Sequence, residues 1–159
     1  MKRKIFLVFV FILVIIQFIR PKLNNKDDYD LAYFIEETKL NKHLFVIMKN
    51  SCFDCHSNKT NYPWYSHISP VSMWIQNHID EGKKHLNFSK WDKYSLKKKE
   101  HKLEELIEEI QEDEMPLKSY KLIHTSSRLD NKQKDSILNW AMKTKIIYQD
   151  LLSENKNKH

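Results

Sequence analysis

The stretch Ser51–Ser57, SCFDCHS, carries both cysteines of the 159-residue chain and places a histidine directly after the second. Two thiols three positions apart beside an imidazole have four possible explanations. They attach a haem covalently, supply part of a zinc site, form a disulfide or redox pair, or stand together by accident. The rest of the sequence has to separate these alternatives.

Covalent haem attachment is the explanation that uses all three side chains. Cys-x-x-Cys-His is typical of c-type haem, in which two thiols react with the vinyl groups and the imidazole becomes an axial ligand of the iron. Here Cys52 and Cys55 would form the thioethers and His56 would bind the iron. The spacing therefore predicts a single covalently bound haem c.

The alternatives remain open, but each lacks a partner feature. A disulfide between Cys52 and Cys55 would close too small a loop to stabilise the fold much. A thioredoxin-like redox pair is expected in a βαβ setting. A zinc site needs four ligands, so two would have to be histidines, and the candidates show no tight ligand spacing. These candidates are His67, His78, His85 and His124.

A low-spin haem also needs a second axial ligand, for which Met115 is the leading candidate. It lies in Glu114-Met115-Pro116, where a helix is expected to give way to a loop. A thioether is a soft ligand that raises the reduction potential, and the neighbouring proline stiffens the loop. His78, on the apolar stripe of a predicted helix, is the rival ligand. Alternatively, either residue could simply be part of the protein core without binding iron.

The elements that position these residues are predicted to be helices. One glycine and four prolines in 159 residues argue against a turn-rich β fold, and apolar residues recur at helical spacing. We expect a helix or broken helix pair over 31–48. Further helices are expected from Ser69-Pro70 to a C′ residue at Gly82, from Ser95 to about Glu114, and from Asp130 onward, with a loop over 115–129. The predicted class is all-α, a small cytochrome c-like domain.

Large aromatic side chains crowd this small domain. They bury enough area to stabilise a short set of helices, or they also form the walls of a porphyrin pocket. The residues are Tyr62, Trp64, Tyr65, Trp74, Phe88, Trp91 and Trp140.

The N-terminal segment, residues 1–23, is predicted to be a membrane anchor. Lys2-Arg3-Lys4 precedes an apolar run, Ile5 to Ile19, in which Gln17 is the only polar residue. No small-x-small cleavage site follows, so we expect an uncleaved signal anchor. Fifteen helical residues reach about 22 Å, short of a hydrocarbon core of about 30 Å, and the flanking basic residues would make up the difference by snorkelling.

The remaining chain divides into a linker (24–30), a helical domain (31–152) and a polar tail (153–159). Because c-type haem is attached outside the cytoplasm, we expect the domain in the periplasm, held at the bacterial inner membrane. Five of the 27 basic residues flank the anchor, which leaves 22 against 21 acidic residues in 24–159. A domain of net charge +1 is not expected to bind nucleic acid.

Several ordered stretches resemble a known family. CFDCHSNKTNYPWYSHISPVSMW, LNFSKW, EMPLKSYKLIH and a tryptophan in the last helix are similar to the small haem-binding domain family of bacterial membrane-anchored proteins, itself similar to cytochrome c. The likeness runs from about Leu44 to Trp140. It implies a helical haem-c domain attached at Cys52, Cys55 and His56, with Met115 as the distal ligand by analogy. The chain departs from that pattern in having almost no glycine, and none in the loop just before Met115.

The expected function is therefore a membrane-anchored monohaem protein that transfers one electron to or from a redox partner protein, and not a turnover enzyme. Two other classes remain. A five-coordinate haem would bind or sense NO, CO or peroxide if Met115 did not reach the iron. A zinc- or disulfide-stabilised anchored module would have no redox role.

Overall fold

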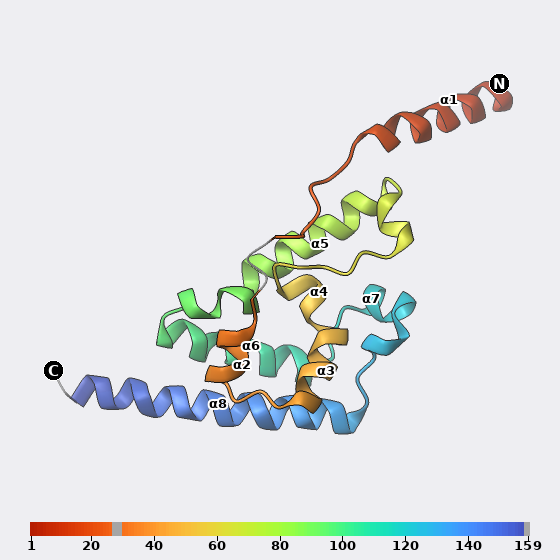
Figure 1. Ribbon diagram of the computed structural model, residues 1–159. Helices are drawn as coiled ribbons and strands as arrows, with labels where there is room; N and C mark the ends of the chain where they lie inside the picture. The colour runs from red at the N-terminus through yellow and green to blue at the C-terminus, as the bar shows by residue number, and fades with distance from the viewer. Residues whose placement is uncertain (27–29, 158–159) are drawn as a thin grey trace.

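Helices dominate the chain (Figure 1). The computed structural model describes residues 1–26 and 30–157; residues 27–29 of the predicted linker and 158–159 of the predicted tail lie outside the described residues. The all-α class is confirmed, since the described residues form helices and, in place of strands, only an isolated antiparallel bridge between Asn25 and Lys59. The elements are α1 (Lys2–Ile15), η1 (Ile16–Phe18), α2 (Ala32–Glu37), α3 (Lys42–Ser51), α4 (Phe53–His56), η2 (Trp64–His67), α5 (Val71–His85), η3 (Phe88–Lys93), α6 (Leu96–Gln111), α7 (Lys118–Ile123), η4 (Thr125–Ser127) and α8 (Asn131–Asn157).

The long helix α8 forms one side of the domain, and α6 packs along it (Figure 1). Leu103 and Ile110 of α6 are buried in the same cluster as Ile137, Ala141 and Tyr148 of α8. Successive positions lie four or seven residues apart, which keeps them on one face of each helix. The helices predicted from Ser95 and from Asp130 onward are confirmed.

Five aromatic rings fill the centre of the core: Phe34, Phe53, Phe88, Trp91 and Trp140. Phe34 is fully buried, and the other four ring centroids lie between 4.6 and 6.5 Å from its own. Both indole N–H groups are satisfied, because Trp91 donates to the Tyr148 hydroxyl at 3.1 Å and Trp140 to the Thr38 carbonyl at 3.0 Å. Part of the predicted aromatic set is thus core, as its size alone suggests.

Two predicted helix starts are confirmed by their caps. The Ser95 hydroxyl accepts a hydrogen bond from the Lys98 N–H at 3.3 Å. Asp130 and Gln133 form a reciprocal capping box, in which each side chain accepts from the other's backbone N–H, at 2.8 and 3.0 Å. Local side-chain chemistry therefore sets where α6 and α8 begin.

The start of α5 differs from the prediction by one residue. Pro70, and not Ser69, is its N-cap residue. The Ser69 hydroxyl instead donates to the Ile19 carbonyl at 3.1 Å and lies 3.0 Å from the Ser72 hydroxyl. A tertiary contact with the N-terminal segment has replaced the expected cap.

Two regions predicted to be irregular contain helix. The expected loop over 115–129 holds α7 and η4, which are too short to show a period in the sequence. Residues 153–157 of the expected tail continue α8, because neither glycine nor proline interrupts this polar run.

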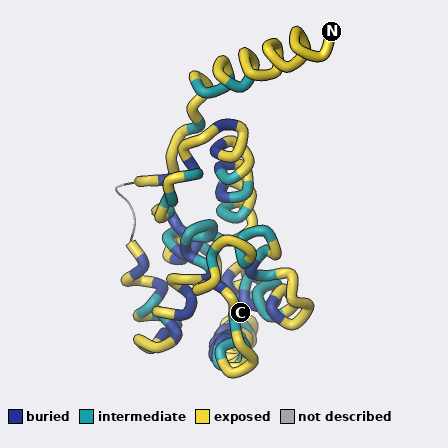
Figure 2. The backbone as a smooth tube through the Cα atoms, turned by 90° about the vertical axis from the view of Figure 1, so that its right-hand side faces the viewer, coloured by how far each residue is buried: buried dark blue, intermediate teal, exposed yellow. Residues whose placement is uncertain are grey.

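The predicted anchor forms the 14-residue helix α1, which projects from the domain (Figure 1) and whose residues are all exposed or half-buried (Figure 2). Among the described residues no helix has both the length and the apolar character needed to cross a membrane. The segment after α1 is tied to the domain. The Gln17 side chain donates to the Ser69 carbonyl at 2.9 Å and accepts from its N–H at 3.0 Å, and Arg20 donates to the His67 carbonyl at 2.6 Å.

Candidate functional site

The cysteine motif forms one tight helical turn. Helix α3 ends at Ser51, Cys52 has a non-helical backbone (φ −125°, ψ −45°), and α4 follows at once. The His56 N–H donates to the Cys52 carbonyl at 2.9 Å, which closes the turn. Phe53 is 2% exposed and belongs to the aromatic core, so its burial fixes α4 in place. The two thiols and the imidazole are thereby held on a single rigid turn.

His56 is held through one ring nitrogen and keeps the other for a ligand. Its Nδ1 lies 3.0 Å from the Leu86 carbonyl oxygen. A carbonyl only accepts hydrogen bonds, so Nδ1 carries the proton and Nε2 has the free lone pair in the neutral ring. Burial lowers the pKa of His56, although the carbonyls of Leu86 and Gly82 act in the opposite direction. The neutral ring with an oriented Nδ1–H is the form in which histidine binds metals.

Gly82 has a different role from the predicted one. It does not end α5, which continues to His85. A Cβ atom at this position would lie 3.0 Å from the Cys55 carbonyl oxygen and 3.3 Å from the Cys55 Cβ. Glycine is therefore needed for the close approach of α4 to α5.

Both thiols are free and half-buried. Burial raises the pKa of Cys52 to about 12, with the nearby Cys55 adding to the effect. Burial also raises the pKa of Cys55 to about 12, and the Asp54 carboxylate adds to it. Both side chains are consequently protonated thiols at neutral pH in the haem-free chain, and zinc binding would have to displace both protons.

The zinc alternative also lacks ligands. Within residues 1–26 and 30–157, no three His, Cys, Asp or Glu side chains come together in a group that could hold a metal ion. Of the histidines considered from the sequence, His78 and His124 line a pocket beside Cys55, and His85 lies at the end of α5. A four-ligand site at the cysteines is not assembled.

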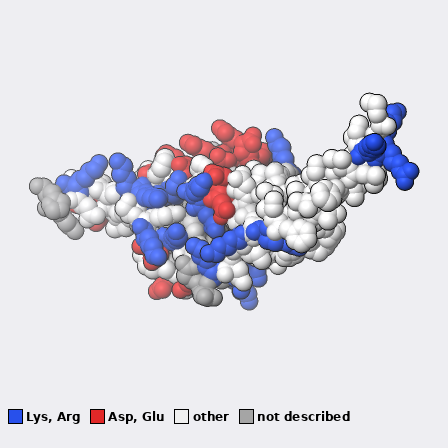
Figure 3. Space-filling model, turned by 90° about the horizontal axis from the view of Figure 1, so that it is seen from above, with Lys and Arg blue, Asp and Glu red and all other residues white. Residues whose placement is uncertain are grey.

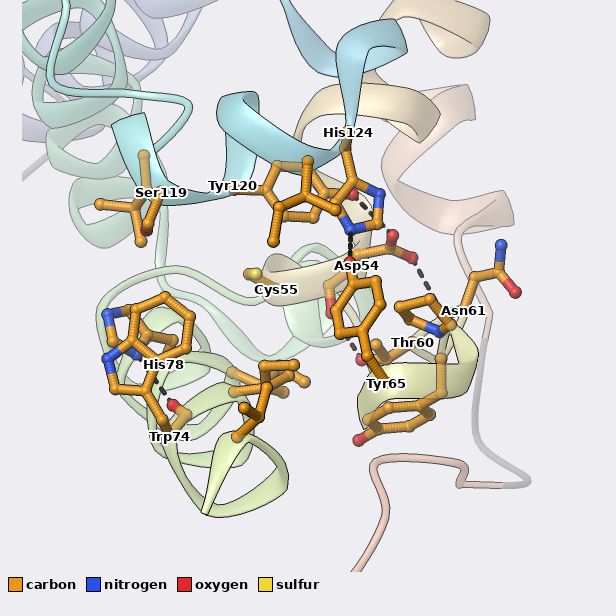
Figure 4. Close-up of a pocket in the computed structure, with 17 residues that line it drawn as sticks. Asp54, Cys55, Thr60, Asn61, Tyr65, Trp74, His78, Ser119, Tyr120 and His124 are labelled. Carbon is orange, nitrogen blue, oxygen red and sulfur yellow. Dashed lines mark hydrogen bonds between the residues drawn. The ribbon is translucent and has the colours of Figure 1, made fainter. Parts of the chain in front are cut away.

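A pocket of about 80 Å³ opens between α4, α5 and α7, and its lining is mostly apolar. Figure 4 shows Cys55 between the pair Trp74 and His78 on one side and the pair Tyr65 and His124 on the other. The apolar lining comes mainly from Val71, Trp74, Ile75, Ile79, Leu117 and Ile123. Tyr65 and Trp74, two of the aromatic residues expected near a cofactor, do lie beside a motif cysteine.

Helix α7 is held over the motif by two polar contacts. The Tyr120 hydroxyl donates to Asp54 Oδ2 at 2.7 Å, and the Tyr65 hydroxyl lies 2.5 Å from His124 Nε2 (Figure 4). The rings of Tyr120 and His124 stack with centroids 4.2 Å apart. Burial raises the pKa of Tyr120, and the Asp54 charge raises it further, so the hydroxyl stays a donor. We call these contacts the α7 latch; Asp54 lies between the two cysteines in the sequence.

The candidate second ligands are placed differently. His78 lines the pocket at Cys55, and its Nδ1 lies 2.9 Å from the Trp74 carbonyl oxygen, which leaves Nε2 available. His124 lines the same pocket. Met115 is half-buried against the hydrophobic core and is not part of the pocket lining. The second axial ligand remains a prediction for both Met115 and His78.

The side chains of the turn are those that covalent haem attachment requires, but the pocket beside them is too small for a whole haem. The turn offers two thiols and an oriented imidazole in the required order. Cys52 packs against the core and the His56 ring lies edge-on to Phe88, at a centroid distance of 6.4 Å, while Cys55 faces the pocket. About 80 Å³ takes only the edge of a porphyrin. Helix α7 is the least buried wall, since each of its residues is exposed or half-buried.

A helical domain that carries a Cys-x-x-Cys-His turn is typical of the haem-binding proteins. The chain is a member of the haem-binding domain family, whose family model matches residues 11–143. No curated protein and no solved structure shows significant similarity to the chain. The predicted haem-binding family is thus confirmed, and it describes a binder or carrier of haem rather than an enzyme.

Proposed function

We propose that the chain is a membrane-anchored, periplasm-facing c-type monohaem protein that transfers one electron at a time. The observation that carries this proposal is His56, a half-buried neutral imidazole whose Nδ1–H is fixed by the Leu86 carbonyl, so that Nε2 keeps the lone pair with which a histidine binds iron. In the sequence, His56 comes directly after Cys55 and four residues after Cys52, and both cysteines are free, protonated thiols. When bound, the haem supplies an iron(II)/iron(III) couple.

The residues of the chain would bind and tune that group. Cys52 and Cys55 would hold it covalently, and His56 would be its axial ligand. The hydrogen bond from Nδ1 to Leu86 orients the ring and raises its basicity, and the aromatic core beside it limits access of water. These are the levers by which a protein sets a haem potential.

Covalent attachment is tested with the full chain, produced in cells that carry a haem-c maturation system. We expect haem staining on a denaturing gel, a c-type reduced pyridine spectrum, and loss of both in the double variant Cys52→Ala/Cys55→Ala. Ser119→Ala is the matched control, because Ser119 lines the same pocket but is not a candidate haem ligand, and this variant should keep its stain. Haem that leaves the wild-type chain on denaturation would refute the proposal.

A five-coordinate haem that binds NO, CO or peroxide is a second candidate function. It is favoured by the position of Met115 against the core, away from the pocket at Cys55. The two functions differ in one spectrum. With methionine ligation, Met115→Ala should abolish the long-wavelength sulfur-to-iron charge-transfer band of the oxidised protein. A wild-type protein that lacks this band and takes up CO when reduced would favour the binder.

The proposed location rests on residues 1–23. Helix α1 exposes an apolar surface, with basic residues in its first turn and beyond its end. Insertion of this segment into the inner membrane would leave the domain on the periplasmic side, where a redox partner protein can reach it. The near-neutral charge of 24–159 gives no reason to expect nucleic acid as a partner.

A further inference from the structure

Two long stretches of the sequence contain no Asp, Glu, Lys or Arg, although 30% of all residues are charged. They are 5–19, which forms α1 and η1, and 60–79, which covers η2 and most of α5. The fold brings the two together, through the Gln17 contacts with Ser69. Figure 3 shows the result: an uncharged surface that continues from α1 onto the domain, with basic side chains at the free end of α1.

Large apolar side chains are exposed where these stretches meet. We call them the foot patch: Phe18 (81% exposed), Ile19 (51%), Trp64 (76%), Ile68 (45%) and Met73 (43%). They belong neither to the buried core nor to the lining of the pocket at Cys55. Hence neither folding nor haem binding explains why this surface lacks charge, and an exposed apolar patch of this kind marks an interaction site.

The length of α1 points to a lipid bilayer as the partner. Fourteen helical residues span about 21 Å, some 9 Å less than a hydrocarbon core of about 30 Å. The foot patch continues the apolar surface beyond the end of α1 and supplies part of the missing depth. Tryptophan is enriched at the membrane–water interface, and Trp64 is the most exposed member of the domain side of the patch.

We propose that the foot patch lies in the interfacial layer of the same bilayer that takes up α1. The domain is then seated on the membrane surface, with η2 and the start of α5 toward the lipid. This inference rests on the proposed anchor, but it adds a second contact that the anchor alone does not require. With the foot patch against the membrane, a soluble partner can reach only the other faces of the domain.

The test uses the haem-loaded full chain in vesicles of phosphatidylethanolamine and phosphatidylglycerol that carry a photoreactive acyl chain. Cross-linked peptides are mapped by mass spectrometry. We expect cross-links in 5–19 and in 60–79. In Trp64→Ser/Ile68→Ser, the cross-links in 60–79 should fall to background, while those in 5–19 persist and the haem spectrum is unchanged.

The matched control is an equally exposed apolar pair on α8, at the opposite end of the molecule from α1 (Figure 1). Ile146 and Ile147 are 55% and 56% exposed, and their peptide should stay at background. Cross-links confined to 5–19 would overturn the inference and leave the anchor intact. Equal labelling of Ile146 and Ile147 would show general adsorption and also overturn it. No lipid cross-links at all would refute the anchor together with the inference, whereas failure of haem attachment shows separately on the stained gel.

Discussion

Two main-chain features at the C-terminal end of α5, Gly82 and the C-cap residue Leu86, position the cysteine motif at α4. Gly82 lets α4 approach closely at Cys55, and the Leu86 carbonyl holds His56 Nδ1. The geometry of the site therefore depends on how closely two helices pack. Small changes in the contact between α4 and α5 should therefore shift the positions of the cysteine side chains.

Gly82→Ala tests this contact. The added Cβ would lie 3.0 Å from a main-chain oxygen that cannot turn away, so α4 has to move. Overpacking costs about 1–3 kcal/mol and the better helix propensity of alanine returns about 1 kcal/mol, so we expect a net loss near 1 kcal/mol. Urea unfolding followed by circular dichroism measures it. Asn77→Ala, at an exposed site on the same helix, should not destabilise; equal effects of the two would contradict the close-packing role.

The thiols of the haem-free chain should react with iodoacetamide far more slowly than ordinary cysteines. Raising the pKa from 9.0 to about 12 lowers the thiolate fraction near neutral pH on the order of a thousandfold. Between pH 7 and 9.5 the rate should keep rising about tenfold per pH unit, while in guanidinium it levels off near the ordinary thiol pKa of about 8.5.

The raised pKa values of the two cysteines also make the stability of the haem-free fold decrease at high pH. The unfolded chain releases its thiol protons at lower pH than the folded one, so the haem-free fold loses stability as pH rises above about 8.5. A folded-state alkylation rate that levels off below pH 9 would show that the thiols are not buried as described.

At this scale the sequence predicts the ligands but not what holds them. Cys52, Cys55 and His56 are recognisable because they are adjacent in the chain. The Leu86 carbonyl is invisible to a residue pattern, because every residue has a carbonyl. The partnership of Asp54 with Tyr120 is equally hidden, since 66 residues separate the two.

Helix α7 is a short element that the polar contacts of the α7 latch hold against the motif. Tyr120→Phe keeps the stacked ring and removes the hydrogen bond to Asp54. Loss of one such bond at a partly exposed site is worth about 1 kcal/mol, so amide exchange over 118–123 should become about fivefold faster. Tyr33→Phe, on α2 and away from the latch, is the control and should leave that exchange unchanged. Unaltered exchange in Tyr120→Phe would mean that packing alone holds α7.

The elements were predictable in proportion to their length. Helices α6 and α8 bury a repeated apolar face and begin at capping side chains, so period and cap agree. Helix α7 has six residues and lacks both signals. Gly82 was assigned to a helix end because glycine commonly stands there, but here a neighbouring helix, absent from any local pattern, required it.

The whole molecule is tied together across the predicted linker 24–30, whose first residue belongs to the domain. Asn24 is 2% exposed; its amide donates to the Ser57 carbonyl and the Thr60 hydroxyl, both at 2.9 Å, and accepts from Lys83 at 2.5 Å. A residue next to the predicted anchor thus binds both the loop after the motif and α5.

Asn24→Ala should therefore destabilise the whole domain, by about 1–3 kcal/mol, because it leaves buried polar groups without partners. The neighbouring substitution Asn25→Ala, at an exposed position, should change the stability by less than about 0.5 kcal/mol. Denaturant midpoints of the two variants make the comparison. If both variants matched the wild type, the segment after α1 would not contribute to the stability of the domain.

The α7 latch has a consequence in time as well as in space. Asp54 stands between the two cysteines, while its partner Tyr120 is synthesised 66 residues later. A chain made from its N-terminus thus presents both thiols before the segment that covers one of them exists. Haem that arrives before α7 has docked would find the cysteine turn uncovered, whereas haem that arrives later would find it covered by α7. If haem is attached covalently as proposed, attachment would therefore compete with closure of the latch, and a chain in which α7 docks first would accept its cofactor more slowly.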